Sequence, residues 1–195
     1  ERPLPDTTVA IGHTRWATHG APTDQNTHPH GAGRVAIVHN GIIENHDQLR
    51  GELDGVEFAS ETDSEVAAHL LRAEVEAGKD LVAAMRSVVT KLEGAFTLVA
   101  VDATDPDRIV AARRNSPLVV GVGEGEYFLA SDVAAFIAYT RDAIELGQDQ
   151  IIELTRDGVN VTSFDGGPAE TKDFHVDWDL EAAQKQGFDW YMRKE

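Results

Sequence analysis

Two short apolar runs, with an irregular polar stretch between them, constrain the possible folds of this chain more than any other feature. Val9-Ala10-Ile11 and Val35-Ala36-Ile37-Val38 are typical of buried strands. Each run ends abruptly in polar residues and glycine, and residues 20–34 hold too many Gly, Pro and Asn residues for a regular element. We therefore expect two core strands that deliver polar side chains to one irregular edge, where a rigid scaffold can present a site.

The polar residues that follow these runs suit the binding of an amino acid. Arg15 carries a planar guanidinium that matches a carboxylate in two hydrogen bonds, and Asp63 can pair with an ammonium. Asn40 offers a side-chain amide and Gly41 a backbone N–H, which together can form an oxyanion hole. Trp16 can wall such a pocket. These residue types predict a site for an amino acid with a reacting side-chain carbonyl.

Each of these residues also has a purely structural interpretation. Arg15 can form a buried ion pair, and Trp16 can belong to the core. Asn40-Gly41 is the commonest hairpin turn pair, although the residues after it do not form a matching return strand. Asp63 lies in a predicted first helical turn, where the helix dipole alone favours an acid. The residue types alone leave these alternatives open.

Beyond this stretch the hydrophobic pattern predicts helices first and strands afterwards. Thr62 and Glu65 have the spacing of a capping box, and Asp80 is a second predicted N-cap. The predicted helices are 45–53, 63–77 and 81–93, and the predicted strands are 56–59, 95–101, 108–114, 118–122, 127–131, 151–154 and 159–161. This order predicts a layered α+β domain with largely antiparallel sheets.

Composition excludes several classes of function. The 195 residues carry a net charge of −17, which argues against a nucleic-acid-binding face, and no apolar run approaches the roughly 20 residues that span a membrane. The absence of cysteine excludes disulfides and thiolate metal sites. His28 and His30 suggest a metal site, but a hydrogen-bonded loop tie is the interpretation that their spacing favours. We interpret His13 and His39 as structural.

Four motifs, in this order along the chain, resemble a known family of enzymes. They are His-Thr-Arg-Trp-Ala-Thr-His-Gly at 13–20, His-Pro-His at 28–30, Val-His-Asn-Gly-Ile-Ile-Glu-Asn at 38–45 and Ser-Glu-Thr-Asp at 60–63. Together they resemble the glutaminase domain of the glutamine–fructose-6-phosphate aminotransferases (isomerising). Sister glutaminases such as amidophosphoribosyltransferase and asparagine synthetase share the Asn-Gly pair and a shorter Arg motif.

The resemblance implies a fold, a reaction and a set of partners. The fold is the four-layer αββα sandwich of N-terminal-nucleophile hydrolases, the class II glutamine amidotransferase type. The reaction is hydrolysis of glutamine through a thioester, with the ammonia passing to fructose 6-phosphate to give glucosamine 6-phosphate. It needs no metal or organic cofactor. The implied partners are glutamine, sugar-isomerase domains of the same polypeptide and a second copy in a homodimer, all in the cytoplasm.

The resemblance also assigns roles to residues of this chain. Arg15 would hold the α-carboxylate of glutamine and Asp63 its α-ammonium, while Asn40 and Gly41 would stabilise the tetrahedral oxyanion. The glutamine-binding residues that it implies are Arg15, Trp16, Thr18, His19 and Asp63. Trp16 would in addition lie near the passage that carries ammonia to the second site.

One feature of the family has no counterpart here. The family uses an N-terminal Cys as its nucleophile, whereas this chain begins with Glu1 and contains no Cys. We therefore expect an N-terminally truncated piece of a longer protein that does not hydrolyse glutamine alone. Residues 1–165 would be a partial glutaminase domain, and residues 166–195 its end and the start of a linker. Two alternatives stay open, namely the same domain serving another acceptor module and a non-catalytic amino-acid-binding module.

Overall fold

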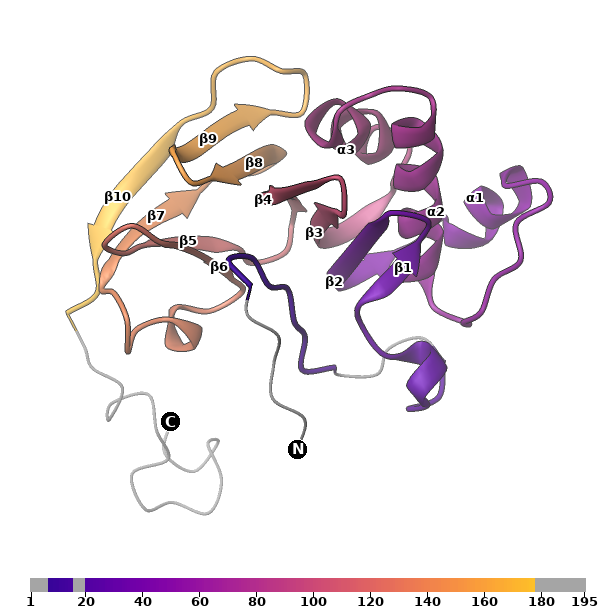
Figure 1. Ribbon diagram of the computed structural model, residues 1–195, viewed down its shortest axis with the longest axis horizontal. Helices are drawn as coiled ribbons and strands as arrows, with labels where there is room; N and C mark the ends of the chain where they lie inside the picture. Colours follow the sequence, from indigo (N-terminus) through magenta and orange to yellow (C-terminus); the bar gives the residue numbers. More distant parts are fainter. Residues whose placement is uncertain (1–6, 16–19, 178–195) are drawn as a thin grey trace. The chain divides into compact units, whose positions relative to one another are not determined.

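A computed structural model describes residues 7–15 and 20–177 of the chain (Figure 1). The described residues fall into two compact units. The first draws on Glu1–Ser116 and Gln148–Ala169, and the second on Pro117–Gly147 and Glu170–Glu195. The chain therefore passes from the first unit to the second, returns to the first, and then enters the second again.

The first unit is built on a six-stranded sheet in which every pairing of neighbouring strands is antiparallel. In spatial order its strands are β1 (His30–Ala32), β2 (Val35–Ile43), β3 (Gly94–Asp102), β4 (Asp105–Arg114), β8 (Gln150–Thr155) and β9 (Gly158–Ser163). β2 and β3 pair along their whole length, from Val35 opposite Asp102 to Ile43 opposite Gly94. This long central ladder is the support on which the candidate site is built.

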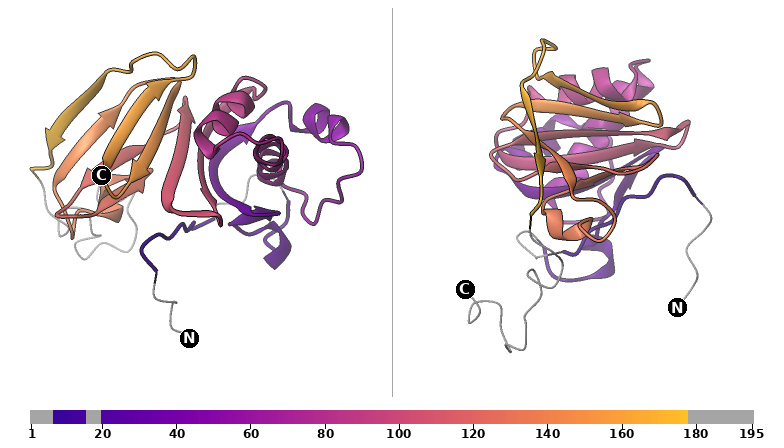
Figure 2. Two further views of the ribbon diagram at one scale, coloured as in Figure 1. Left: turned by 45° about the horizontal axis from the view of Figure 1, so that its top comes forward. Right: turned by 90° about the vertical axis from the view of Figure 1, so that its left-hand side faces the viewer.

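Helices cover one face of this sheet (Figures 1 and 2). The unit contains α1 (His46–Glu52), α2 (Asp63–Glu76), α3 (Leu81–Val89) and the short 3-10 helix η1 (Asp24–Asn26). Alternate residues of β2, among them Ile37 and Ile43, are fully buried in the same core as Val66 and Leu71 of α2. Burial of each such side chain stabilises the fold by roughly 1.5–3 kcal/mol, so this apolar layer fixes α2 against β2.

The second unit has a four-stranded antiparallel sheet of its own. Its strands, in spatial order, are β10 (Thr171–His175), β7 (Asp142–Leu146), β5 (Val119–Val122) and β6 (Tyr127–Ala130), and η2 (Val133–Ala135) is a 3-10 helix. Val119, Phe136 and Ala143 form a small core, and a Cβ at Gly121 would lie 2.7 Å from the Phe136 ring. The described part of this unit contains no α-helix, and no described helix of either unit could cross a bilayer.

Most of the predicted elements are present. Thr62 and Asp80 cap α2 and α3 as predicted, since their side-chain oxygens accept from the backbone N–H groups of Glu65 and Ala83. The predicted helix at 45–53 is α1, the strands after residue 94 are β3 to β6, and the hairpin around Arg156-Asp157-Gly158 is β8–β9. The α+β class and the antiparallel pairing are confirmed.

Several predictions are wrong, and most of them concern strands. Val9-Ala10-Ile11 forms no strand and Ala10 is exposed, because no described strand supplies a ladder for its backbone groups. Residues 56–59 are also irregular, whereas residues 30–32, within the predicted loop, form β1. α3 ends at Val89 and not at Glu93, and the Asn40-Gly41 pair lies inside β2 and not in a turn. The hydrophobic pattern does not predict β7 or β10.

Two glycines bend the β2–β3 ladder at the end that carries the Asn-Gly pair. Gly41 has a φ of +123° and Gly94 a φ of +109°. A Cβ on Gly41 would lie 2.1 Å from the Ala95 carbonyl oxygen, and a Cβ on Gly94 would lie 2.3 Å from that of Ile42. Both positions therefore require glycine, because any other residue would suffer backbone strain and a clash with the partner strand.

We predict that Gly94→Ala lowers the free energy of unfolding by at least about 2 kcal/mol, because it combines a strained φ with a backbone clash. Urea denaturation of the chain measures this. Gly51→Ala is the matched control, because Gly51 lies in α1 with nothing within 4 Å of its added Cβ. It should stabilise the chain by about 0.5–1 kcal/mol. Equal stability of Gly94→Ala and the wild type would contradict the described bend.

Candidate functional site

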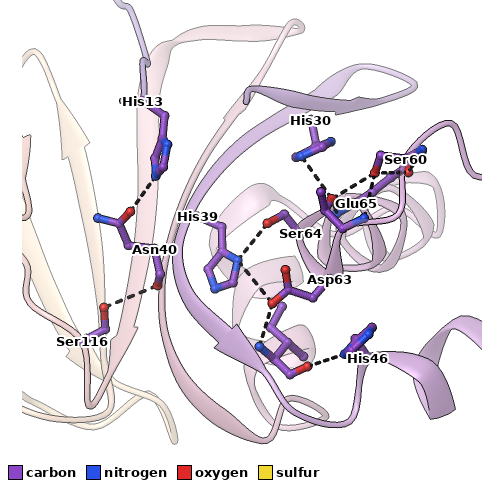
Figure 3. Close-up of polar contacts among 12 residues, drawn as sticks. His13, His30, His39, Asn40, His46, Ser60, Asp63, Ser64, Glu65 and Ser116 are labelled. Atoms are coloured by element: carbon purple, nitrogen blue, oxygen red, sulfur yellow. Dashed lines mark hydrogen bonds and ion pairs between the residues drawn. The ribbon is translucent and has the colours of Figure 1, made fainter. Parts of the chain in front are cut away.

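Asn40 is held both by its backbone and by its side chain. Its backbone pairs with Thr97 of β3, and its carbonyl oxygen accepts from Ser116 Oγ at 3.4 Å. Its side-chain Oδ1 lies 2.6 Å from His13 Nε2 (Figure 3). Strand alternation turns Asn40 away from α2, whereas its neighbour His39 faces that helix. The half-buried amide therefore has a fixed oxygen, and its NH2 group is turned elsewhere.

Gly41 follows Asn40 in the same strand and is exposed. Its close approach to Ala95 gives it a structural reason to be glycine, independent of any ligand. The exposure means that a ligand can reach the backbone at this point. Asn40 and Gly41 thus place a side-chain amide next to an exposed stretch of main chain, the two kinds of group from which an oxyanion hole can be built.

Arg15 makes hydrogen bonds to main-chain carbonyl groups. Its Nη2 donates to the Gly20 oxygen at 2.9 Å and its Nη1 to the Ala21 oxygen at 3.0 Å. The side chain is half-buried, so these contacts fix its position against the polypeptide that follows it. A guanidinium is planar, has five N–H donors and can match a carboxylate in two hydrogen bonds. The same position is compatible with a carboxylate ligand.

Asp63 is the first residue of α2 and is only 3 % exposed. Its Oδ2 accepts from the backbone N–H of Ile43 at 2.9 Å and lies 3.9 Å from His39 Nδ1, which is 2.9 Å from Ser64 Oγ (Figure 3). The carboxylate therefore joins the start of α2 to the end of β2, two residues beyond Gly41. This contact gives Asp63 a structural role whether or not it binds a ligand.

A compact hydrogen-bond network holds the first turn of α2. Glu65 accepts from the backbone N–H groups of Ala59 and Ser60 at 2.8 and 2.6 Å and from Ser60 Oγ at 2.6 Å. Thr62 Oγ1 accepts from the Glu65 N–H at 3.3 Å, which is one half of the predicted capping box, whereas the Thr62 N–H donates to Ser60 Oγ and not to Glu65. Burial raises the pKa of Glu65, but the hydrogen bonds from Ser60 and Ala59, together with His69, outweigh it and hold the pKa below its ordinary value.

Three histidines pack in a row between Asn40 and this network. The ring centroids of His13 and His28 are 4.2 Å apart, those of His28 and His30 are 4.8 Å apart, and His30 Nε2 lies 3.1 Å from Thr62 Oγ1. Burial, followed by the charges of His13 and His30, lowers the pKa of His28 to about 3, so this ring is neutral at neutral pH. His30 makes the hydrogen-bonded tie expected of it. The described residues contain no group of three ligands that could hold a metal ion.

The structure does not address every residue that the sequence singled out. Trp16, Thr18 and His19 lie outside the described residues. Conversely, the sequence suggests only a structural role for His13, whereas in the structure it contacts Asn40. The only sequence signal for His13 was its place at the start of the motif that contains Arg15.

Comparison with known families decides the class of this domain. A family model described as a glutamine amidotransferase domain matches residues 13–138, which include Arg15, Asn40, Gly41 and Asp63. The chain belongs to this family. Its site residues therefore lie within a domain type defined by the use of glutamine.

Similarity to individual proteins extends over the whole chain. It is 67% identical over 199 residues to the glutamine–fructose-6-phosphate aminotransferase (isomerizing) of Streptomyces coelicolor, covering 100% of this chain and 32% of that protein. It is 57% identical over 199 residues to the Corynebacterium diphtheriae protein of the same name, covering 99% and 32%. The chain thus spans about a third of the length of these curated relatives, and the resemblance to their glutaminase domain is confirmed.

Solved structures confirm the fold. A structure titled as the allosteric regulatory enzyme of purine biosynthesis matches with a TM-score of 0.65 and 25% identity, covering 78% of this chain and 34% of that one. The Bacillus subtilis glutamine phosphoribosylpyrophosphate amidotransferase, complexed with ADP and GMP, matches with a TM-score of 0.64 and 23% identity over 78% and 34%. The chain has the α+β fold of class II glutamine amidotransferases, of the N-terminal-nucleophile type.

We predict that Glu65→Gln destabilises the chain at pH 7 by about 1.5–3 kcal/mol, the usual worth of hydrogen bonds to a charged group. Because the folded-state pKa of Glu65 is lowered, its stabilisation is present above about pH 4.5 and is lost as the pH falls through that folded-state pKa. The variant should therefore differ most from the wild type at neutral pH and converge with it in acid.

Urea denaturation at several pH values between 7 and 3 measures this difference. Glu57→Gln removes the same charge from an exposed position and is the control for the change in net charge. A Glu65→Gln variant whose stability parallels that of Glu57→Gln at every pH would rule out the network as the cause.

Proposed function

We propose that this chain is the glutamine-binding part of a glutaminase that supplies ammonia for the conversion of fructose 6-phosphate to glucosamine 6-phosphate. The observation that carries the proposal is the Asn40-Gly41 pair at the end of β2, where the amide oxygen is turned to His13 and the main chain is exposed. The 67% identity to a glutamine–fructose-6-phosphate aminotransferase, over the entire chain, supports the choice of acceptor.

In the proposed chemistry, the α-carbon end and the side-chain amide of glutamine are bound by different residues. Arg15 holds the α-carboxylate in a bidentate contact and Asp63 attracts the α-ammonium. A thiol attacks the side-chain amide carbon, and the oxyanion that forms accepts hydrogen bonds from Asn40 Nδ2 and the Gly41 N–H. Collapse of this intermediate expels ammonia and leaves a thioester, which water hydrolyses to glutamate. Each oxyanion donor lowers the barrier by roughly 3 kcal/mol.

The burial of Asp63 bears on how it would bind an ammonium. A carboxylate has about four acceptor positions, and the Ile43 N–H uses one of them. An ammonium that donates to another position would reach Asp63 close to the end of β2, where Ile43 lies. The low exposure of the carboxylate, 3 %, favours a strong charge interaction because water screens it poorly.

The proposal extends to the protein as a whole. These 195 residues contain no Cys, so the thiol must come from outside them and the chain alone should not hydrolyse glutamine. Residues 166–195 would end the domain and lead to sugar-isomerase domains, within a cytoplasmic homodimer. Trp16, Thr18 and His19 would complete the glutamine pocket, and no metal or organic cofactor takes part.

We predict that Arg15→Ala and Asp63→Asn, made in the intact gene product, each raise the KM for glutamine at least about 10-fold, because each removes a charged contact to the ligand. Amination of fructose 6-phosphate with free ammonia should survive in both. The Asn side chain can still accept from Ile43 N–H, so Asp63→Asn separates the charge from the structural tie. Steady-state assays of glutamate and glucosamine 6-phosphate formation measure both activities.

Arg72→Ala is the control, because Arg72 is a partly exposed arginine of α2 that pairs with Glu76. It should leave both activities unchanged. If ammonia-dependent activity fell as much as glutamine-dependent activity, Arg15 and Asp63 would be structural. If the intact protein bound glutamine without ever releasing ammonia, it would be an amino-acid-binding module and not a glutaminase.

A further inference from the structure

We propose that His13 is a positioning residue, which fixes the orientation of the Asn40 side-chain amide so that its NH2 group serves as the oxyanion donor. This inference rests on the proposed function of Asn40. The contact that suggests it is the 2.6 Å separation of His13 Nε2 from Asn40 Oδ1 (Figure 3). Because Oδ1 can only accept, His13 must donate from Nε2.

An asparagine needs such a contact if it is to act as an oxyanion donor. A half-turn about its Cβ–Cγ bond exchanges the oxygen and the NH2 group, which have the same shape and opposite hydrogen-bonding character. An oxygen turned toward the reaction centre would repel the developing negative charge, whereas the NH2 group would stabilise it. A donor on Oδ1 removes this ambiguity before the substrate arrives.

Ring packing, and not pairing within a strand, fixes the position of the His13 imidazole. Residues 7–15 form no regular element, so no backbone ladder places His13. Its ring instead packs against His28, which meets His30 edge-on, and His30 is tied to the N-cap Thr62 of α2. The row therefore connects the orientation of Asn40 to the rigid first turn of that helix.

The other nitrogen of His13 supports the same assignment. His13 Nδ1 is buried and has no hydrogen-bond partner among residues 7–15 and 20–177. In the tautomer with Nε2 as the donor, Nδ1 carries only a lone pair. The opposite tautomer would bury an unpaired N–H and would set the Nε2 lone pair against the oxygen of Asn40. The environment thus selects the tautomer that holds the amide as described.

Nuclear magnetic resonance tests the orientation on this chain without any need for activity. Long-range ¹H–¹⁵N spectra distinguish the two imidazole tautomers, and we expect the Nε2–H form for His13. In His13→Phe, which keeps a ring but removes the donor, the Asn40 side-chain NH2 signals should shift, while those of Asn160 on β9 should not. An Nδ1–H tautomer, or unchanged Asn40 signals in His13→Phe, would overturn the inference.

Kinetics of the intact gene product test the consequence. His13→Phe should lower kcat for glutamine hydrolysis about 10- to 100-fold, less than the 10²–10³-fold expected for loss of an oxyanion donor, with little change in KM. His13→Gln can place an N–H near the Nε2 position and should restore most of kcat. In an Asn40→Ala background, His13→Phe should cost no further activity, since the two residues act as one unit.

The outcomes separate this inference from the proposed function. A full additional loss from His13→Phe in the Asn40→Ala background, or a rise in KM at constant kcat, would show that His13 only supports the fold and would overturn the inference. A wild-type protein without glutaminase activity, or an Asn40→Ala variant with full activity, would instead remove the proposed function. The tautomer and amide signals would then still decide the orientation. Thermal unfolding of each variant verifies that it is folded.

Discussion

The rest of the site depends on the hydrogen bonds that connect the first turn of α2 to the neighbouring strands, a set of contacts called here the seam. Asp63 accepts from Ile43 at one end of the seam, and Thr62 contacts His30 of the adjacent strand at the other. These polar contacts are buried, where an unmade hydrogen bond costs about 1–3 kcal/mol. These contacts therefore fix the position of β2 relative to α2. Asn40 lies on β2, so its position is fixed as well.

The bend at Gly41 and Gly94 determines which groups of β2 a ligand can reach. A regular antiparallel ladder has negative φ angles throughout. The positive φ values of the two glycines change the course of both strands where the Asn-Gly pair lies. A strand that is largely buried up to His39 therefore has exposed residues at Gly41 and Ile42, before it ends at the buried Ile43. The site combines the stiffness of a sheet with the accessibility of a loop.

Sequence reasoning succeeded where the signal was local. Both helix caps, the hairpin at Arg156-Asp157-Gly158 and the amphipathic helices follow from residues within a few positions of one another. It failed for residues 9–11 and for β10, because a strand exists only where a distant segment pairs with it. The motifs identified Asn40, but only three-dimensional geometry revealed His13 as its neighbour, since no spacing encodes a contact between a loop and a strand.

The discontinuous path of the chain has a consequence for how the domain can be dissected. The first unit is completed by β8 and β9, which follow the excursion of residues 117–147 into the second unit. Because each unit consists of two separate segments, cleavage at one peptide bond cannot release either unit as a continuous polypeptide. During synthesis, β8 and β9 can pair with the first sheet only after residues 117–147 have been made. The length of this intervening segment adds little to the entropic cost of closing the loop. The first unit can therefore be complete only after residues 148–169 have been synthesised.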